Sequence, residues 1–217
     1  MSTGELPRTV VHLVRHGEVD NPSGVLYGRL PGFHLSERGR AMAARLADVF
    51  APRDLAVVVS SPLERARETA APIAAASGCP LHLDERVVEA ANVFEGTRLG
   101  NGERLRDHRE ALPRLANPFR PSWGEPYASV AARVLAAAAA VRDRSVGREG
   151  VIVSHQLPIW VARRQVEGRR LWHDPRRRQC SLASVTSLVY EEHRIVSVSY
   201  TEPAFDLLPV VKPVPGA

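Results

Sequence analysis

The sequence predicts an α/β protein, a three-layer α/β/α sandwich around a mainly parallel central sheet. Short apolar runs rich in β-branched residues alternate along the chain with amphipathic segments of helical periodicity. Strands that alternate with helices pair in parallel, because each helix carries the chain back to the same end of the sheet. The chain has 217 residues, of which 44% are hydrophobic and 24% charged, so we expect one domain over residues 1–217 with a sizeable core.

The first strand–helix unit begins with the apolar run Thr9–Val14, which we interpret as a buried strand. A loop rich in Pro and Gly, Asn21–His34, follows it. Ser36 is the predicted N-cap of the next helix, whose apolar side chains recur at helical spacing as far as Phe50.

The second unit begins with a predicted strand at Leu55–Val59. Ser61 as N-cap with Pro62 at the first helical position is typical of a helix start. Gly78 is expected to end this helix, and Pro72 is expected to kink or interrupt it.

The second half of the chain contains a segment of little periodicity. Residues 97–126 are rich in Gly, Pro and Arg and are predicted to form an insertion or lid, whereas the tail at 203–217 is Pro-rich and expected to be extended. The remaining predicted elements are strands at Pro80–Leu83 and Gly150–Val153, a helix at Ser129–Arg144, and strands at Ala183–Tyr190 and Arg194–Tyr200.

Polar side chains follow four of the predicted strands directly. They are Arg15 and His16, the segment Ser60–Arg65, the segment Glu85–Glu89, and the pair Ser154–His155. Ligands of parallel α/β sheets bind beyond the carboxyl ends of the strands. We therefore expect two histidines, two arginines and a glutamate to gather at one edge of the sheet.

Such a cationic cluster is suited to a phosphoryl group. Guanidinium groups bind phosphate oxygens in bidentate fashion, and a neutral imidazole is a competent nucleophile near pH 7. A carboxyl group with a raised pKa could protonate the departing oxygen. Attack by histidine would split the hydrolysis of a phosphate ester into formation and breakdown of a phosphoenzyme, with neither a metal nor a cofactor.

Five motifs in order along the chain resemble one known family. They are LVRHGEVDN (13–21), YGRLPGFHLSERGRAMA (27–43), SSPLERARETA (60–70), GEPYASVAARV (124–134) and VIVSHQ (151–156). In this order they are similar to the histidine phosphatase superfamily, also called phosphoglycerate mutase-like. The ordered set is far more specific than the triplet RHG alone. The resemblance implies a phosphoglycerate mutase-like fold.

The resemblance also implies roles for particular residues. His16 would be the catalytic nucleophile, Arg15 and Arg65 would bind the phosphate, and His155 would bind and stabilise the transferring phosphoryl group.

Glu89 is our first choice for the proton donor. The spacing from Glu89 to the following FEG triplet is shorter than in many members, so Glu95 and Glu85 stay open as alternatives. Asn21 is a predicted phosphate contact, although it lies one residue nearer to the RHG motif than the usual family asparagine. Gln156 stands where the family often has glycine.

The expected function is hydrolysis of a small phosphorylated metabolite by a metal-independent histidine phosphatase. The first alternative is a phosphoglycerate mutase-like isomerase, which is less favoured because the loop after RHGE departs from the mutase-like pattern. The second is a basic module that binds phosphorylated ligands or nucleic acid, since the net charge is +5. Aromatic residues are only 6% and supply no stacking platform, and the run Arg176–Arg178 is interpreted as a solvated turn, so we expect no nucleic-acid partner.

The setting is expected to be cytoplasmic, with no membrane partner. The first ten residues contain no apolar stretch, and no run approaches the length that spans a bilayer. The two cysteines, Cys79 and Cys180, are too few for a disulfide framework, and no CxxC motif is present to hold zinc.

Overall fold

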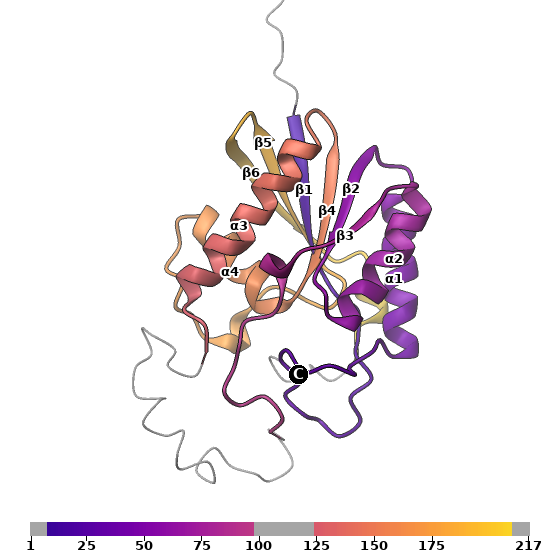
Figure 1. The fold of residues 1–217 in the computed structure, drawn as a ribbon, viewed down its shortest axis with the longest axis vertical. Helices are drawn as coiled ribbons and strands as arrows, with labels where there is room; N and C mark the ends of the chain where they lie inside the picture. Colours follow the sequence, from indigo (N-terminus) through magenta and orange to yellow (C-terminus); the bar gives the residue numbers. More distant parts are fainter. Residues whose placement is uncertain (1–7, 98–123, 210–217) are drawn as a thin grey trace, which may run out of the picture.

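A six-stranded mixed sheet forms the middle layer of the protein (Figure 1). The computed structural model describes residues 8–97 and 124–209. The strand order is β3-β2-β4-β1-β5-β6. The strands are β1 (Arg8–Arg15), β2 (Leu55–Ser60), β3 (Leu81–Leu83), β4 (Glu149–Ser154), β5 (Val185–Glu191) and β6 (Arg194–Thr201), and the helices are α1 (Glu37–Phe50), α2 (Glu64–Ser77), α3 (Tyr127–Arg144) and α4 (Gln156–Val166).

Four neighbouring strands of the sheet are parallel. β1 pairs with β4, β4 with β2, and β2 with β3, all in parallel. β5 adds to the free edge of β1 in antiparallel orientation, and the hairpin strand β6 pairs antiparallel with β5. The prediction of an α/β fold with a mainly parallel sheet is confirmed.

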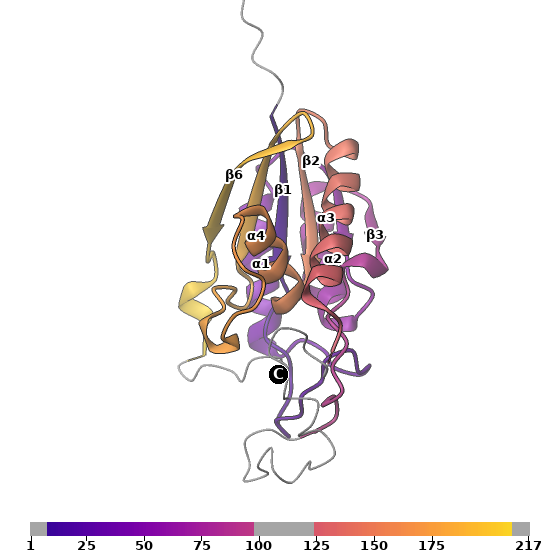
Figure 2. The ribbon, with the colours of Figure 1, turned by 90° about the vertical axis from the view of Figure 1, so that its left-hand side faces the viewer.

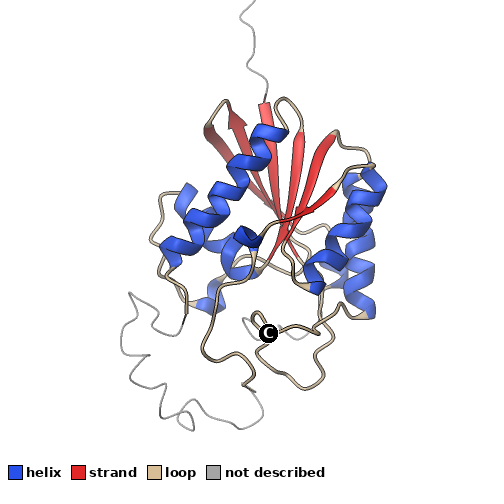
Figure 3. Ribbon diagram, in the orientation of Figure 1, coloured by secondary structure: helices blue, strands red, loops and turns tan. Residues whose placement is uncertain are grey.

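Helices cover both faces of the sheet, as the blue helices beside the red strands show in Figure 3. Successive side chains of a strand point to opposite faces. Accordingly Val57 and Val59 of β2 pack in one core cluster with α3 and α4, whereas Val58 packs in the other with α1 and α2. The three layers follow from strands that are apolar on both sides.

The parallel strands end together at the lower end of the sheet as drawn in Figures 1 and 2. Backbone hydrogen bonds join the segments just beyond them: the His16 N–H donates to Ser154 O at 3.1 Å, and the Ser61 N–H donates to Val153 O at 2.9 Å. The residues that follow β1, β2 and β4 are thereby held side by side.

The start of α2 differs from the prediction. The helix begins at Glu64, with Leu63 as its N-cap in an extended conformation, so Ser61 and Pro62 precede it. The Ser61 hydroxyl pairs with His155 Nε2 at 2.8 Å. Pro72 lies inside α2 without ending it.

The helix α4 was not among the predicted elements. It follows His155 directly and has no side-chain cap, and Pro158 stands in its first turn, where proline is tolerated.

The tail is also more structured than expected at its start, since Phe205–Leu207 form a 3-10 helix and Asp206 pairs with Arg45 of α1 at 3.1 Å. The predicted lid at 97–126 and the end of the tail fall largely outside the described residues. Within the described part of the chain, no helix has both the length and the apolar character needed to cross a membrane.

Candidate active site

Two buried histidines face each other beyond the ends of β1 and β4. His16 is 2% exposed and His155 is 0% exposed, and their ring centroids lie 5.1 Å apart. The two strands are direct neighbours in the sheet. The prediction that these histidines gather at one sheet edge therefore agrees with the geometry.

The hydrogen bond of His16 defines which ring nitrogen is nucleophilic. Nδ1 lies 2.8 Å from the carbonyl oxygen of Gly17. Because a carbonyl only accepts, Nδ1 carries the proton and Nε2 keeps its lone pair. Burial, followed by the charges of Arg65 and Arg15, holds the pKa of His16 well below its ordinary value of 6.5. The imidazole is thus neutral at pH 7.

Gly17 allows the close approach that orients this ring. A Cβ at this position would lie 2.6 Å from the carbonyl oxygen of Gly39 in α1, too close for any side chain. The Gly17 N–H donates to the hydroxyl of Thr69 in α2 at 3.1 Å. The loop after β1 is therefore pressed between the first turns of α1 and the body of α2.

His155 is oriented by Ser61, whose hydroxyl lies 2.8 Å from Nε2. The Ser61 oxygen also accepts the N–H of Leu63 at 3.4 Å. With the Ser61 hydroxyl donating to Nε2, the imidazole proton is on Nδ1, a buried atom with no hydrogen-bond partner among the described residues. Burial is the first cause that lowers the pKa of His155 well below 6.5, and the charge of Arg65 is the second.

Arg65 is the largest fully buried side chain in the described part of the chain. It comes from the first turn of α2, donates from Nη2 to the Gly28 carbonyl at 2.6 Å, and lies over the Tyr27 ring at 4.6 Å. Arg15 is 4% exposed and donates from Nη1 to the Cys180 carbonyl at 2.7 Å. Arg15 Nε and Arg65 Nε and Nη1 are buried and have no partner among the described residues. These N–H groups are available to an anion.

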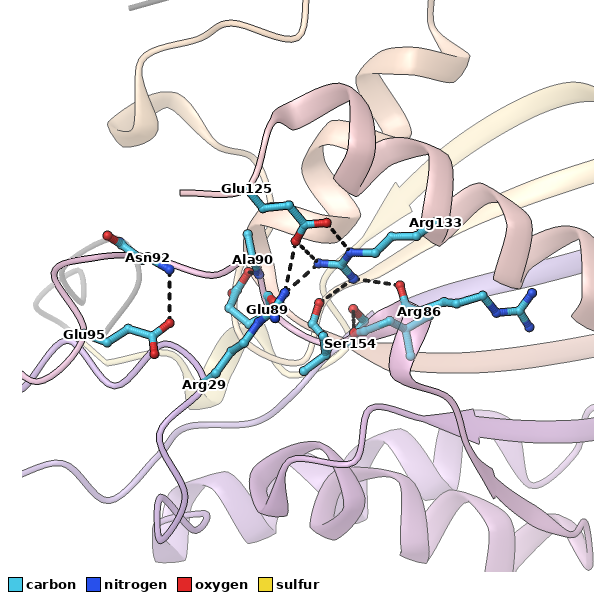
Figure 4. Close-up of polar contacts among 11 residues, drawn as sticks. Arg29, Arg86, Glu89, Ala90, Asn92, Glu95, Glu125, Arg133 and Ser154 are labelled. Carbon is cyan, nitrogen blue, oxygen red and sulfur yellow. Dashed lines mark hydrogen bonds and ion pairs between the residues drawn. The ribbon is translucent and has the colours of Figure 1, made fainter. Parts of the chain in front are cut away.

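Glu89, the first choice among the three candidate acids, interacts electrostatically with the site arginines Arg65 and Arg15. Burial raises the pKa of Glu89 above its ordinary value of 4.5, against the opposing effect of those charges. Glu85 is exposed. Glu95 accepts the Asn92 N–H at 3.2 Å and lies apart from Glu89 in Figure 4. The geometry therefore favours Glu89, and its catalytic role stays a prediction.

The family model of the histidine phosphatase superfamily (branch 1) matches residues 11–203. The chain belongs to the histidine phosphatase superfamily. It is 56% identical over 196 residues to an uncharacterized protein of Mycobacterium tuberculosis, Rv0525, covering 90% of this chain and 97% of that one. It is 32% identical over 191 residues to phosphoserine phosphatase 1 of Hydrogenobacter thermophilus, covering 85% and 88%. The structure of mycobacterial glucosyl-3-phosphoglycerate phosphatase matches with a TM-score of 0.68 at 25% identity, covering 89% and 96%.

In this histidine phosphatase superfamily member, the amide of Asn21 is occupied by its own loop. Nδ2 donates to the Val25 carbonyl at 2.9 Å and Oδ1 accepts the Val25 N–H at 3.1 Å. Nδ2 carries two N–H groups, so the predicted phosphate contact would use the second one, and it stays a prediction.

Arg178 is a site residue that the sequence interpretation missed. Arg176 and Arg177 are exposed, as expected of a solvated turn, but Arg178 is half-buried. Its Nε donates to His173 Nε2 at 2.9 Å and its Nη1 to Gln156 Oε1 at 3.4 Å. Its charge acts on Glu89, lowering the pKa of that carboxyl against the effect of burial. No sequence signal distinguishes it from the two arginines before it, because packing alone buries it.

The site chemistry of this superfamily member is therefore cationic. Arginines supply the positive charge, one neutral imidazole presents a lone pair, and one carboxyl group has a raised pKa. Within residues 8–97 and 124–209, no group of three or more His, Cys, Asp or Glu side chains is arranged to hold a metal ion.

Proposed function

We propose that this protein is a phosphatase that hydrolyses a small phosphate monoester through a phosphohistidine on Nε2 of His16, without a metal or cofactor. One observation carries the proposal. Four nitrogen atoms of the side chains adjacent to His16 are buried without partners among the described residues: Arg15 Nε, Arg65 Nε and Nη1, and His155 Nδ1. Buried donors are normally hydrogen-bonded, so a phosphoryl group with three oxygen acceptors completes this cluster.

In the first step, Nε2 of His16 attacks phosphorus and the ester P–O bond breaks. The Glu89 carboxyl, whose protonated form is favoured because burial raises its pKa, gives its proton to the leaving oxygen. The two arginines and His155 neutralise the charge on the transferring group, which is the main requirement of phosphoryl transfer. In the second step, the Glu89 carboxylate takes a proton from water, the hydroxyl attacks phosphorus, and the P–N bond breaks to release phosphate and restore His16.

The two named relatives support a phosphatase and suggest its substrate class. By their names, one acts on phosphoserine and the other on glucosyl-3-phosphoglycerate, both of which carry a phosphate ester and a carboxylate. The half-buried Arg178 next to Gln156 offers a further cation for such a carboxylate. We therefore propose a small phosphorylated metabolite as the substrate.

The test is phosphate release from an aryl phosphate and from a panel of small phosphometabolites. We expect wild type to release phosphate, His16→Ala to release none, and a control substitution at the exposed His193, in the β5–β6 turn, to leave the rate unchanged. Activity should survive a chelator. Activity lost with EDTA and restored by a divalent ion contradicts the metal-independent mechanism.

The same substrate panel, together with a DNA-binding measurement, separates the two alternative functions. Isomerisation of 3-phosphoglycerate without phosphate release would show a mutase. If wild type neither hydrolyses nor isomerises any substrate but binds DNA with a salt-dependent, sequence-independent affinity, the chain is a basic binding module.

A further inference from the structure

The peptide unit that joins Glu89 to Ala90 orients the candidate proton donor. Glu89 Oε1 accepts the backbone N–H of Ala90 at 2.8 Å. That N–H and the carbonyl of Glu89 belong to one planar peptide group. A hydrogen bond that fixes the Glu89 carbonyl therefore also fixes the direction of the Ala90 N–H, and that N–H in turn is hydrogen-bonded to the Glu89 carboxyl group.

The Glu89 carbonyl is held by two arginines from distant parts of the chain (Figure 4). Arg29, in the loop after β1, donates from Nε at 2.6 Å, and Arg133 of α3 donates from Nη2 at 3.3 Å. Hydrogen bonds from charged donors are stronger than neutral ones. The Glu89–Ala90 peptide is thus anchored from two sides.

Arg133 also holds the residues that lead to Glu89. Its Nη1 donates to the carbonyls of Arg86 and Val88, both at 2.7 Å. This segment, between β3 and Asn92, contains one 3-10 turn, so most of its carbonyls have no partner in regular structure. One guanidinium therefore takes the place of a strand ladder for three carbonyls of this segment.

Glu125 fixes both arginines. Its two carboxylate oxygens accept Arg133 Nε and Nη2, each at 2.9 Å, in a bidentate pair, and Oε2 also accepts Arg29 Nη2 at 3.0 Å. The Glu125 N–H donates to Ala91 O at 3.2 Å. Because the Arg133 and Glu125 side chains are only 17% and 21% exposed, this pair is less screened by solvent than a surface ion pair.

We propose that Arg133, Glu125 and Arg29 form a clamp that positions the Glu89 carboxyl group for proton transfer to the leaving oxygen. Arg133 is the central positioning residue, and it acts through Glu89 rather than by touching the substrate. The inference rests on the proposed function, because it presumes that Glu89 is the acid of that reaction.

The test compares Arg133→Met with Arg142→Met, a matched change on the same helix. Arg142 pairs with Asp143, away from the 86–89 segment. Protonation by an acid matters for an alkyl phosphate, whose leaving oxygen is strongly basic, and matters little for p-nitrophenyl phosphate. We expect Arg133→Met to lower kcat for the best alkyl substrate by about 10²-fold, the lower end of the contribution of a general acid. The rate with p-nitrophenyl phosphate should change by less than about threefold, because the acid contributes little to that reaction.

A double variant decides whether Arg133 acts through Glu89. In a Glu89→Gln background, Arg133→Met should cause no further loss, since residues that act as a unit are not additive. An equal loss with both substrates, or a further loss in the Glu89→Gln background, would overturn the clamp. If Arg133→Met does not fold, Arg133→Lys, which keeps the charge but not the bidentate pair, and Arg29→Met replace it.

A second measurement needs no catalysis. Hydrogen exchange at the Ala90 amide should accelerate in Arg133→Met and stay unchanged in Arg142→Met, and unchanged exchange in both would contradict the clamp. Failure of the proposed function has a different signature, namely wild type that releases no phosphate and forms no phosphohistidine. Full activity of Glu89→Gln on alkyl substrates would refute the clamp while leaving the His16 chemistry intact.

Discussion

Replacement of Arg65 by methionine should change the stability of the fold and the catalytic activity in opposite directions. Arg65 is completely buried, and two of its nitrogens have no partner in the described part of the chain. Burial lowers the pKa of Arg65, as does the nearby charge of Arg15, against the opposing effect of neighbouring acidic groups. Burial of such a charged side chain costs free energy, and a bound anion would offset that cost. We therefore expect Arg65→Met to be a more stable protein and a much poorer enzyme.

The magnitudes follow from the contacts of Arg65. The substitution removes the bond to Gly28 O and the contact with the Tyr27 ring, which together stabilise the fold by about 2–4 kcal/mol. It also removes two unsatisfied N–H groups and the cost of burying a charge, which amount to about 4–6 kcal/mol. The difference is a gain in the free energy of unfolding of about 0–4 kcal/mol, and its middle value of about 2 kcal/mol corresponds to a rise in Tm of roughly 4–8 °C for a chain of this size. Loss of two donors to the transferring phosphoryl group should lower kcat/KM by at least about 10³-fold.

Thermal unfolding with and without inorganic phosphate, beside steady-state kinetics, measures both effects. Phosphate should raise the Tm of wild type, because it binds only the folded state, and should leave the Tm of Arg65→Met unchanged. A variant less stable than wild type by more than about 2 kcal/mol, or one that keeps activity within tenfold, would refute the reasoning.

Three further predictions concern the proton donor Glu89, the pH dependence of the rate, and Asn21 in the loop after β1. Glu89→Gln should lower the rate with alkyl phosphates by about 10²-fold, whereas Glu95→Gln should stay within about threefold in the same assay. In a pH–rate profile of kcat/KM, the acid limb should lie below pH 6.5, because protonation of His16 occurs only at its lowered pKa. The alkaline limb should lie above pH 4.5, the ordinary value for glutamate, since the raised pKa of Glu89 keeps its proton to higher pH, and Glu89→Gln should abolish this limb. Asn21→Ala should lower kcat/KM by less than about tenfold, because its amide forms hydrogen bonds with Val25 of its own loop; a loss above about 10²-fold would instead support the predicted phosphate contact.

The fold and the core of the site could be predicted because they depend on patterns that the sequence displays. The run Thr9–Val14 has the apolar, β-branched character of a buried strand, and the rule that ligands bind at the carboxyl ends of parallel strands places the residues after it near those after Gly150–Val153. His16 and His155 are therefore brought together by topology alone. The family membership inferred from the five motifs is confirmed over residues 11–203.

The remaining features of the site and fold depend on packing and on backbone contacts, which leave no recognisable pattern in the sequence. Arg178 is buried by the surrounding structure and not by its neighbours in sequence. Arg133 binds three carbonyl groups, and carbonyl groups are the same in every residue. The start of α2 was misplaced because Leu63 is extended and the helix begins only at Glu64, although the Ser61 hydroxyl, which pairs with His155, also accepts the Leu63 N–H.

The central claim is that a phosphoryl group passes through Nε2 of His16. Rapid mixing of the enzyme with its best substrate, followed by alkaline quench and mass spectrometry of the peptides, tests it most directly. The account predicts a transient gain of one phosphoryl group on the peptide that contains His16, stable to base and labile to acid, with none in His16→Ala. Phosphate release at the wild-type rate without any phosphorylated His16, or from His16→Ala, would contradict it.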